Sequence, residues 1–333
     1  MSQATLAAES RTRARVMQAA TLSAPQTFSL DTAAVPQPGP GQVRIRVEGC
    51  GLCGSSIPLW EGRNWFDYPQ QPGAPGHEAW GVVDEIGENV TRCKVGDRVA
   101  ALSYHGFAQY DIADAESVVV LPSALSGRPF PGEPLTCAMN IMARSDIRSE
   151  HTVVIIGAGF IGALLTQLAS ATGARVIAVS RRRFALDIAR ACGAAETVQL
   201  EDRHAARDQV LEINGGALCD RVIEAAGLQI TLDLAGELMR ERGRLVIAGF
   251  HQDGPRQVDL QLWNWRGIDV INAHERDPAM YLRGLEAAVD AVVSGHLNPD
   301  PLLTHLLPLR NIADAFRLQQ ERPDGFLKAV VMP

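Results

Sequence analysis

The stretch that decides the fold is Val153-Val154-Ile155-Ile156-Gly157-Ala158-Gly159-Phe160-Ile161-Gly162. Residues 153–156 form a short apolar run typical of a buried strand, and the residues after Gly162 have a helical pattern to about Thr172. The spacing G-x-G-x-x-G between a strand and a helix is typical of a dinucleotide-binding turn, in which the helix N-terminus stabilises phosphate charge. The sequence therefore predicts cofactor-binding residues, which are Gly157, Gly159, Phe160, Ile161 and Gly162.

The end of the next expected strand, 175–179, bears on the choice of cofactor. A carboxylate at this point would bind the ribose 2′-hydroxyl of NAD. This chain has Ser180, Arg181 and Arg182 instead, followed by Arg183. Three cations at a helix N-terminus oppose the helix macrodipole, and a bound 2′-phosphate would relieve that repulsion and accept charge-assisted hydrogen bonds. The residues favour NADP over NAD, although a solvated charged surface remains an alternative interpretation.

The rest of the chain divides into three parts. Apolar strands at 221–224, 244–248 and 268–271 alternate with helical patterns, which indicates a doubly wound parallel sheet covered on both faces. The first third is instead rich in short strands, at 42–47, 80–86 and 117–121, with many glycines and prolines. The last part contains an expected helix between Asp277 and Gly295 and a final strand at 326–332. The predicted fold class is α/β plus β.

Composition excludes several classes of function. The chain has 333 residues, 46% of them hydrophobic, and a net charge of −7, which disfavours nonspecific binding to nucleic acid or to acidic membranes. It contains no run of 18 apolar residues that could span a bilayer. Residues 1–15 lack the apolar core of a signal peptide and are expected to form a frayed leader. Six scattered cysteines do not suggest a disulfide framework, so a cytoplasmic location is expected.

Candidate metal ligands lie outside the α/β region. Cys53, His77 and Glu133 offer thiolate, imidazole and carboxylate groups, a donor set that suits a catalytic Zn²⁺ with one open position. Their separation in sequence does not by itself bring them together.

A resemblance to a known family joins these residues. The run Gly76-His77-Glu78-x-x-Gly81, with Gly87, Val90 and Val95-Gly96-Asp97-Arg98-Val99, is similar to the zinc alcohol dehydrogenase signature. With the other motifs it resembles the medium-chain dehydrogenase/reductase superfamily, in particular its polyol- and threonine-dehydrogenase-like branches. The resemblance extends in order over the chain after residue 15. The other motifs are Gly51-Leu52-Cys53-Gly54-Ser55, Gly106-Phe107-Ala108-Gln109-Tyr110, Glu133-Pro134-Leu135 and the Gly157 turn.

The resemblance implies a domain organisation and roles for individual residues. A GroES-like catalytic domain would span residues 1–133 and 278–333, and a Rossmann domain residues 134–277. Cys53 and His77 match catalytic zinc ligands, and Ser55 matches the hydroxyl that passes the substrate proton onward. Glu133 falls where the family places a third protein ligand. Glu78 matches a carboxylate that binds the metal in some members and lies behind it in others. Because adjacent residues of a strand point to opposite faces, we rank Glu133 above Glu78 as the third ligand.

Two departures from the family pattern stand out. Ser56 occupies the position of an Asp that usually orients the histidine ligand, so support for His77 is weaker or comes from another group. The four-cysteine lobe that holds a structural zinc in many members is missing, and Cys93 is the only cysteine near that position. One catalytic zinc and no structural zinc are therefore expected.

The function expected from the resemblance is hydride transfer between NADP(H) and a secondary alcohol or polyol, or the matching ketone. The enzyme would have a small-molecule substrate and form a homodimer or homotetramer, with neither a nucleic acid nor a membrane as partner. One alternative is a metal-free reductase of the quinone or enoyl type with the same fold. Another is a nucleotide-sensing binding protein that has lost its activity.

Overall fold

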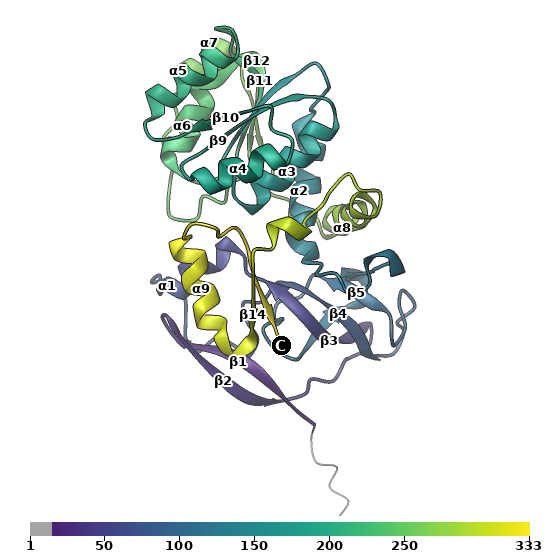
Figure 1. The fold of residues 1–333 in the computed structure, drawn as a ribbon. Coiled ribbons are helices and arrows are strands. Elements are labelled where there is room, and N and C mark those ends of the chain that lie inside the picture. Colours follow the sequence, from purple (N-terminus) through teal and green to yellow (C-terminus); the bar gives the residue numbers. More distant parts are fainter. Residues whose placement is uncertain (1–14) are drawn as a thin grey trace, which may run out of the picture.

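The computed structural model describes residues 15–333. Its strands form a six-stranded sheet, a seven-stranded sheet and a separate hairpin. Figure 1 shows the six-stranded sheet with its helices in the upper part and the β-rich part below. The expected leader lies outside the described residues except for Arg15, where the expectation is wrong. The Arg15 carbonyl accepts a hydrogen bond from the Val35 N–H, and its guanidinium lies 3.3 Å from Asp84 Oδ2.

The six-stranded sheet is parallel throughout, in the order β10-β9-β8-β11-β12-β13. The chain runs outward from β8 to β10 and then returns to β11 on the other side of β8. The strand order therefore reverses between β8 and β11, where doubly wound sheets bind nucleotides. The prediction of a doubly wound parallel sheet is confirmed. The strands are β8 (Thr152–Ile156), β9 (Arg175–Ser180), β10 (Glu196–Gln199), β11 (Cys219–Glu224), β12 (Met239–Ile247) and β13 (Asp269–Asn272).

Helices cover both faces of this sheet. Side chains alternate along β8, so Val153 and Ile155 pack in one buried cluster with α3 and α4, while Val154 and Ile156 pack in another with α5 and α6. This burial on both faces explains why residues 153–156 of β8 are all apolar. The helices are α3 (Phe160–Ala171), α4 (Arg183–Ala191), α5 (Arg203–Ile213), α6 (Gln229–Leu238) and α7 (Leu260–Arg266).

The seven-stranded sheet combines strands from the first third of the chain with two strands from its C-terminal part. Its order is β14-β15-β3-β4-β5-β7, and β6 also pairs with β3. The last strand, β15, lies antiparallel to β3 near Cys50 and Gly51. The strands are β3 (Gln42–Gly51), β4 (Glu78–Ile86), β5 (Arg98–Ala101), β6 (Tyr110–Asp114), β7 (Val118–Val120), β14 (His305–Pro308) and β15 (Ala329–Met332).

Two short helices and a hairpin pack beside this sheet. In Figure 1, α1 (Ile57–Glu61) and α9 (Ile312–Glu321) lie together at the same side of the sheet. The hairpin of β1 (Val16–Ala24) and β2 (Thr27–Ala34) was not expected from the sequence. No residue of its second strand is fully buried, and Leu30 is 45% exposed, so the strand lacks the buried apolar face that would mark it.

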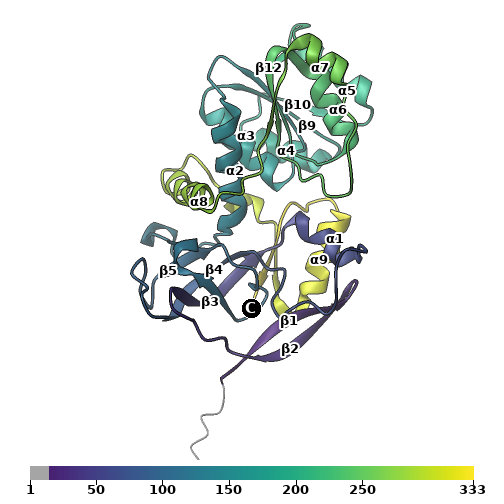
Figure 2. The ribbon, with the colours of Figure 1, turned by 180° about the vertical axis from the view of Figure 1, so that it is seen from behind.

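Two helices connect the parts. In both Figure 1 and Figure 2, α2 (Gly132–Ser145) and α8 (Pro278–Val293) lie between the sheets. One buried cluster continues from Trp80 and Ala100 of the β-rich part, through Leu285 of α8, to Ile155 of the parallel sheet. The two parts therefore share a continuous core at this junction. No helix in the described range combines the length and apolar character that a membrane span requires.

The glycine turn gives a stability prediction. A Cβ atom on Gly162 would lie 1.9 Å from the carbonyl oxygen of Gly157, which is backbone and cannot rotate away. Gly162→Ala should therefore lower the free energy of unfolding by about 3 kcal/mol in urea denaturation. Gly159→Ala is the matched control, because its Cβ would meet no atom within 4 Å and its φ is −75°. The control should stay within about 0.5 kcal/mol of wild type. Equal effects of the two substitutions would contradict this explanation of the turn.

Candidate metal and cofactor site

Cys53 lies just beyond the end of β3, at the start of the short 3₁₀ turn Gly54–Ser56. The chain leaves the sheet here, so the thiol is partly buried rather than enclosed. The Ser55 Oγ donates a hydrogen bond to the Cys53 Sγ at 3.1 Å. Two residues predicted to belong to one site are therefore in direct contact.

His77 lies immediately before β4. Its Nδ1 is 2.9 Å from the Pro75 carbonyl oxygen, which can only accept, so Nδ1 carries a proton. A backbone carbonyl thus orients the ring in place of the carboxylate that Ser56 replaces. Burial disfavours the charged ring, but a hydrogen bond with Cys53 and nearby negative charges outweigh it and raise the pKa of His77 to about 10. Such a negative environment also favours a metal cation.

Glu78, the first residue of β4, is fully buried against Lys328. The Lys328 Nζ lies 2.6 Å from each carboxylate oxygen, but it donates a well-directed hydrogen bond only to Oε1. The Glu78 Oε2 has no hydrogen-bond partner. Burial raises the pKa of Glu78, although the Lys328 charge acts in the opposite direction. One carboxylate oxygen of Glu78 therefore keeps an unused lone pair.

Glu133 lies in the first turn of α2, beside this group rather than in it. Its Oε1 accepts hydrogen bonds from the Tyr281 hydroxyl and, at 3.4 Å, from the Cys137 thiol. Its negative charge contributes to raising the pKa of His77. Burial and the Glu133 charge raise the pKa of Tyr281, so this hydroxyl keeps its proton.

The residues present fit a zinc ion. Within residues 15–333, Cys53, His77 and Glu78 form the one group of three potential ligands whose atoms all lie within 4.8 Å of one another. Tetrahedral Zn²⁺ with ordinary bond lengths separates its ligand atoms by about 3.3–3.8 Å, so small side-chain movements would suffice. A thiol, an imidazole and a carboxylate with an unpartnered oxygen are the donors that such a site requires.

The cofactor turn has the geometry that the glycines predict. Gly157 has a φ of +107°, and a Cβ there would lie 2.9 Å from the Ala225 backbone. Gly159 faces open space, as approach by a pyrophosphate requires. Helix α3 begins at Phe160 with no side-chain cap and no acidic residue in its first turn, which leaves its N–H groups for a phosphate.

Lys328 connects the cofactor turn with the metal group. Its Nζ lies 4.9 Å from the centroid of the Phe160 ring while it pairs with Glu78. Lys328 is not among the residues predicted from the sequence, although a single lysine in the apolar run 326–332 is a usable signal.

The arginines at the end of β9 have different surroundings. The Arg182 Nη1 donates to the Phe326 carbonyl oxygen at 2.6 Å, which ties it to the C-terminal segment. Arg183 Nε donates to Gln199 Oε1 at 3.2 Å and is exposed. Arg181 is exposed, and Ser180 is partly buried at the strand end.

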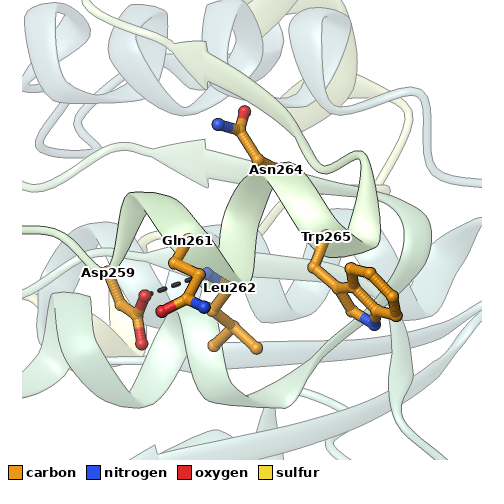
Figure 3. Close-up of a pocket in the computed structure, with 5 residues that line it drawn as sticks. All are labelled: Asp259, Gln261, Leu262, Asn264 and Trp265. Atoms are coloured by element: carbon orange, nitrogen blue, oxygen red, sulfur yellow. Dashed lines mark hydrogen bonds between the residues drawn. The ribbon is translucent and has the colours of Figure 1, made fainter.

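A surface hollow of about 610 Å³ on α7 lies elsewhere. Figure 3 shows its lining, in which Asp259 accepts a hydrogen bond from the Leu262 N–H at 2.9 Å and thereby caps the helix. Trp265 at the other end is 85% exposed. The hollow contains none of the candidate metal or cofactor residues, so it is not the site described above.

Comparisons with known proteins support the same class of protein. Residues 39–125 match the family described as alcohol dehydrogenase GroES-like domain, and residues 161–290 match the zinc-binding dehydrogenase family. Together these matches cover about two thirds of the chain. The fold and these matches define an oxidoreductase with a GroES-like domain and a Rossmann-type sheet.

Individual relatives extend over most of the chain. D-arabitol-phosphate dehydrogenase from Enterococcus avium is 29% identical, with 85% of this chain and 88% of that protein covered. Erythritol/L-threitol dehydrogenase from Mycolicibacterium smegmatis is also 29% identical, with 88% and 91% covered. A zinc-binding dehydrogenase from Sinorhizobium meliloti 1021, solved bound to NADP, has a TM-score of 0.82 and 27% identity, with 96% and 100% covered. The chain belongs to the zinc-dependent alcohol dehydrogenase family of the medium-chain dehydrogenase/reductase superfamily.

The pair of Lys328 and Glu78 gives a second prediction. Lys328→Met would leave a fully buried carboxylate without its cation, so the free energy of unfolding should fall by about 3–5 kcal/mol. Urea denaturation in the presence of a chelator measures this without a contribution from metal. The double substitution Lys328→Met and Glu78→Gln should recover most of the loss.

Lys94→Met is the control for this experiment, because the Lys94 side chain is 83% exposed. It should change the free energy of unfolding by less than about 0.5 kcal/mol. A Lys328→Met variant as stable as this control would show that the buried pair contributes little.

Proposed function

We propose that this protein is a zinc-dependent dehydrogenase that transfers a hydride between NADP(H) and a secondary alcohol or polyol, or the matching ketone. The observation that carries the proposal is the group of Cys53, His77 and Glu78, whose ligand atoms lie within 4.8 Å of one another. Lys328 joins this group to the cofactor turn at Phe160. A hydride acceptor and a polarised substrate would therefore meet at the junction of the two parts.

The roles of the residues follow from their contacts. Bound Zn²⁺ would supply Lewis-acid stabilisation of negative charge developing on the substrate oxygen. Cys53, His77 and Glu78 would hold it, and the Pro75 carbonyl fixes the ring of His77. Ser55, in contact with the Cys53 thiol, would accept the substrate proton and pass it toward solvent. Glu133, held by Tyr281 and Cys137, would face the open side of the site.

The cofactor and substrate class are supported by the residues and by the relatives. Ser180, Arg181 and Arg182 offer hydrogen-bond donors where an NAD enzyme has a carboxylate. The Sinorhizobium structure, at 27% identity, is bound to NADP. Both curated relatives are named for polyols or a polyol phosphate, so a polyhydroxylated substrate is proposed. NAD remains the alternative cofactor.

The proposal also covers the domain organisation, the assembly and the location of the protein. We propose a catalytic domain of residues 1–133 and 278–333 and a cofactor domain of residues 134–277, with the substrate entering between them. A homodimer or homotetramer is proposed as the assembly. All six cysteines are free thiols, which is compatible with the proposed cytoplasmic location.

Two alternative functions make different predictions. A metal-free quinone or enoyl reductase would need neither Cys53 nor His77 and would purify without zinc. A nucleotide-sensing protein without activity would bind cofactor but oxidise no alcohol. Zinc analysis together with a turnover screen over polyols and secondary alcohols, with both cofactors, separates the three.

The zinc content is the first test of the proposal. Protein purified without chelator should contain one zinc ion per chain by elemental analysis. Cys53→Ala should lose the metal and turnover but keep its far-ultraviolet circular dichroism, because the ligands lie at a junction rather than within a core. A ratio near zero or near two in the wild type would refute the proposal of a single catalytic zinc.

The same measurement distinguishes the two candidate carboxylates. Glu78→Gln should release zinc at much lower chelator concentration than wild type, since Glu78 belongs to the ligand group. Glu133→Gln, which removes a charge but not a member of that group, should retain zinc more firmly. The reverse order would assign the third ligand to Glu133.

Ser55 gives a kinetic prediction. Ser55→Ala should lower kcat by roughly 100-fold because general acid–base assistance is lost, while the Kd of the cofactor changes little. Ser55→Thr keeps the hydroxyl and should retain most of the activity. Steady-state kinetics and cofactor titration provide both values. An unchanged kcat in Ser55→Ala would show that another group moves the proton.

A further inference from the structure

Three arginines gather where the end of β9 meets the segment after α9. Arg181 and Arg182 follow β9, and Arg322 is the C-cap residue of α9. The hydrogen bond from Arg182 to the Phe326 carbonyl joins the two segments. Partial burial of the guanidinium and the charge of Arg181 lower the pKa of Arg322. Burial lowers the pKa of Arg182, and the charges of Arg322 and Arg181 lower it further, so the three charges repel one another.

This positive charge is not balanced by protein. None of the three arginines forms an ion pair with a carboxylate in the described part of the chain. The charge of Asp324 raises the pKa of Arg182, but Asp324 does not form an ion pair with it. Protein atoms surround part of the Arg322 guanidinium, but Arg322 and Arg181 both keep enough accessible surface for an incoming anion to reach them. The Arg322 Nε uses one donor on the Gln319 carbonyl at 3.2 Å, which leaves other donors of its guanidinium.

The backbone at Arg322 adds a second observation. Arg322 has φ +48° and ψ +58°, the left-handed conformation that favours glycine or asparagine at the end of a helix. An arginine in this conformation costs about 1 kcal/mol. The Arg322 side chain also approaches the turn Gly54–Ser56 that follows Cys53. A Cβ atom built on Gly54 would lie 3.7 Å from the Arg322 Nη2. An arginine therefore occupies a backbone position at which glycine or asparagine would cost less conformational free energy.

We propose that Arg322 binds the 2′-phosphate of NADP together with Arg181, and so helps to select the cofactor. This inference rests on the proposed NADP-dependent function. A phosphate at the end of β9 carries nearly two negative charges and suits bidentate guanidinium contacts. Arg182 uses one donor on the Phe326 carbonyl and keeps others, as Arg322 does, so Arg181 and Arg322 can add their donors to those of Arg182. The 2′-phosphate would thus contact both parts of the chain, whereas NAD would lack this bridge.

The test compares 2′,5′-ADP with 5′-AMP, two nucleotides that differ by the 2′-phosphate and need neither zinc nor substrate. In titration calorimetry, the wild type should bind 2′,5′-ADP at least about 10-fold more tightly than 5′-AMP. Arg322→Gln should reduce that ratio by about 10-fold while the Kd of 5′-AMP changes by less than about twofold. Arg322→Gly should do the same, and its glycine suits the backbone, which guards against a folding defect.

Arg317→Gln is the matched control, because it removes the same charge from the same helix at an exposed ion pair with Asp314. It should leave the ratio unchanged. If the Arg322 variants weaken both nucleotides equally, or neither, the inference is overturned while the preference for NADP stands. If the wild type binds both nucleotides equally, the NADP preference and the inference fail together. Zinc content and turnover with NAD then still report on the dehydrogenase function.

Discussion

The buried ion pair between Lys328 and Glu78 connects the parts of this protein on which its chemistry depends. It joins residues 250 positions apart, one beside the last strand and one on the strand that follows His77. Two charges removed from water are stable only when each satisfies the other. Lys328 also packs on Phe160 at the start of the cofactor helix. The position of the C-terminal segment therefore sets the spacing between the candidate metal ligands and the cofactor turn.

Local patterns allowed much of the fold to be predicted. The strand, glycine turn and helix at 152–171 depend on residues close in sequence, so their pattern was sufficient. The same holds for the helix that begins at Pro278, which Asp277 caps through its side chain. Cys53 and His77 could be paired only through the family resemblance, since their contact depends on the register of β3 with β4.

Contacts between distant segments could not be predicted in this way. Tyr281 reaches Glu133 across 148 residues, and Arg182 reaches Phe326 across 144. The ranking of Glu133 above Glu78 assumed regular strand alternation across residues 77 and 78. In the structure β4 begins only at Glu78, so His77 is not bound by that alternation. The alternation therefore does not decide between the two carboxylates, and the identity of the third ligand stays a prediction.

The metal group and the arginines at the end of β9 carry net charges of opposite sign. A metal cation would offset the first, and a cofactor phosphate would offset the second. At the metal group, a metal ion would bind Cys53 as its thiolate beside the carboxylates of Glu78 and Glu133 and the cation Lys328, so a divalent ion would bring the sum to neutrality. Without it, the negative charge holds a proton on His77. At the end of β9, Arg181, Arg182 and Arg322 form no ion pair with a carboxylate of residues 15–333, so a bound anion would offset their charge. Because residues 322–328 contribute a cation to both places, the proposed binding of metal and of cofactor phosphate would act on the same short segment.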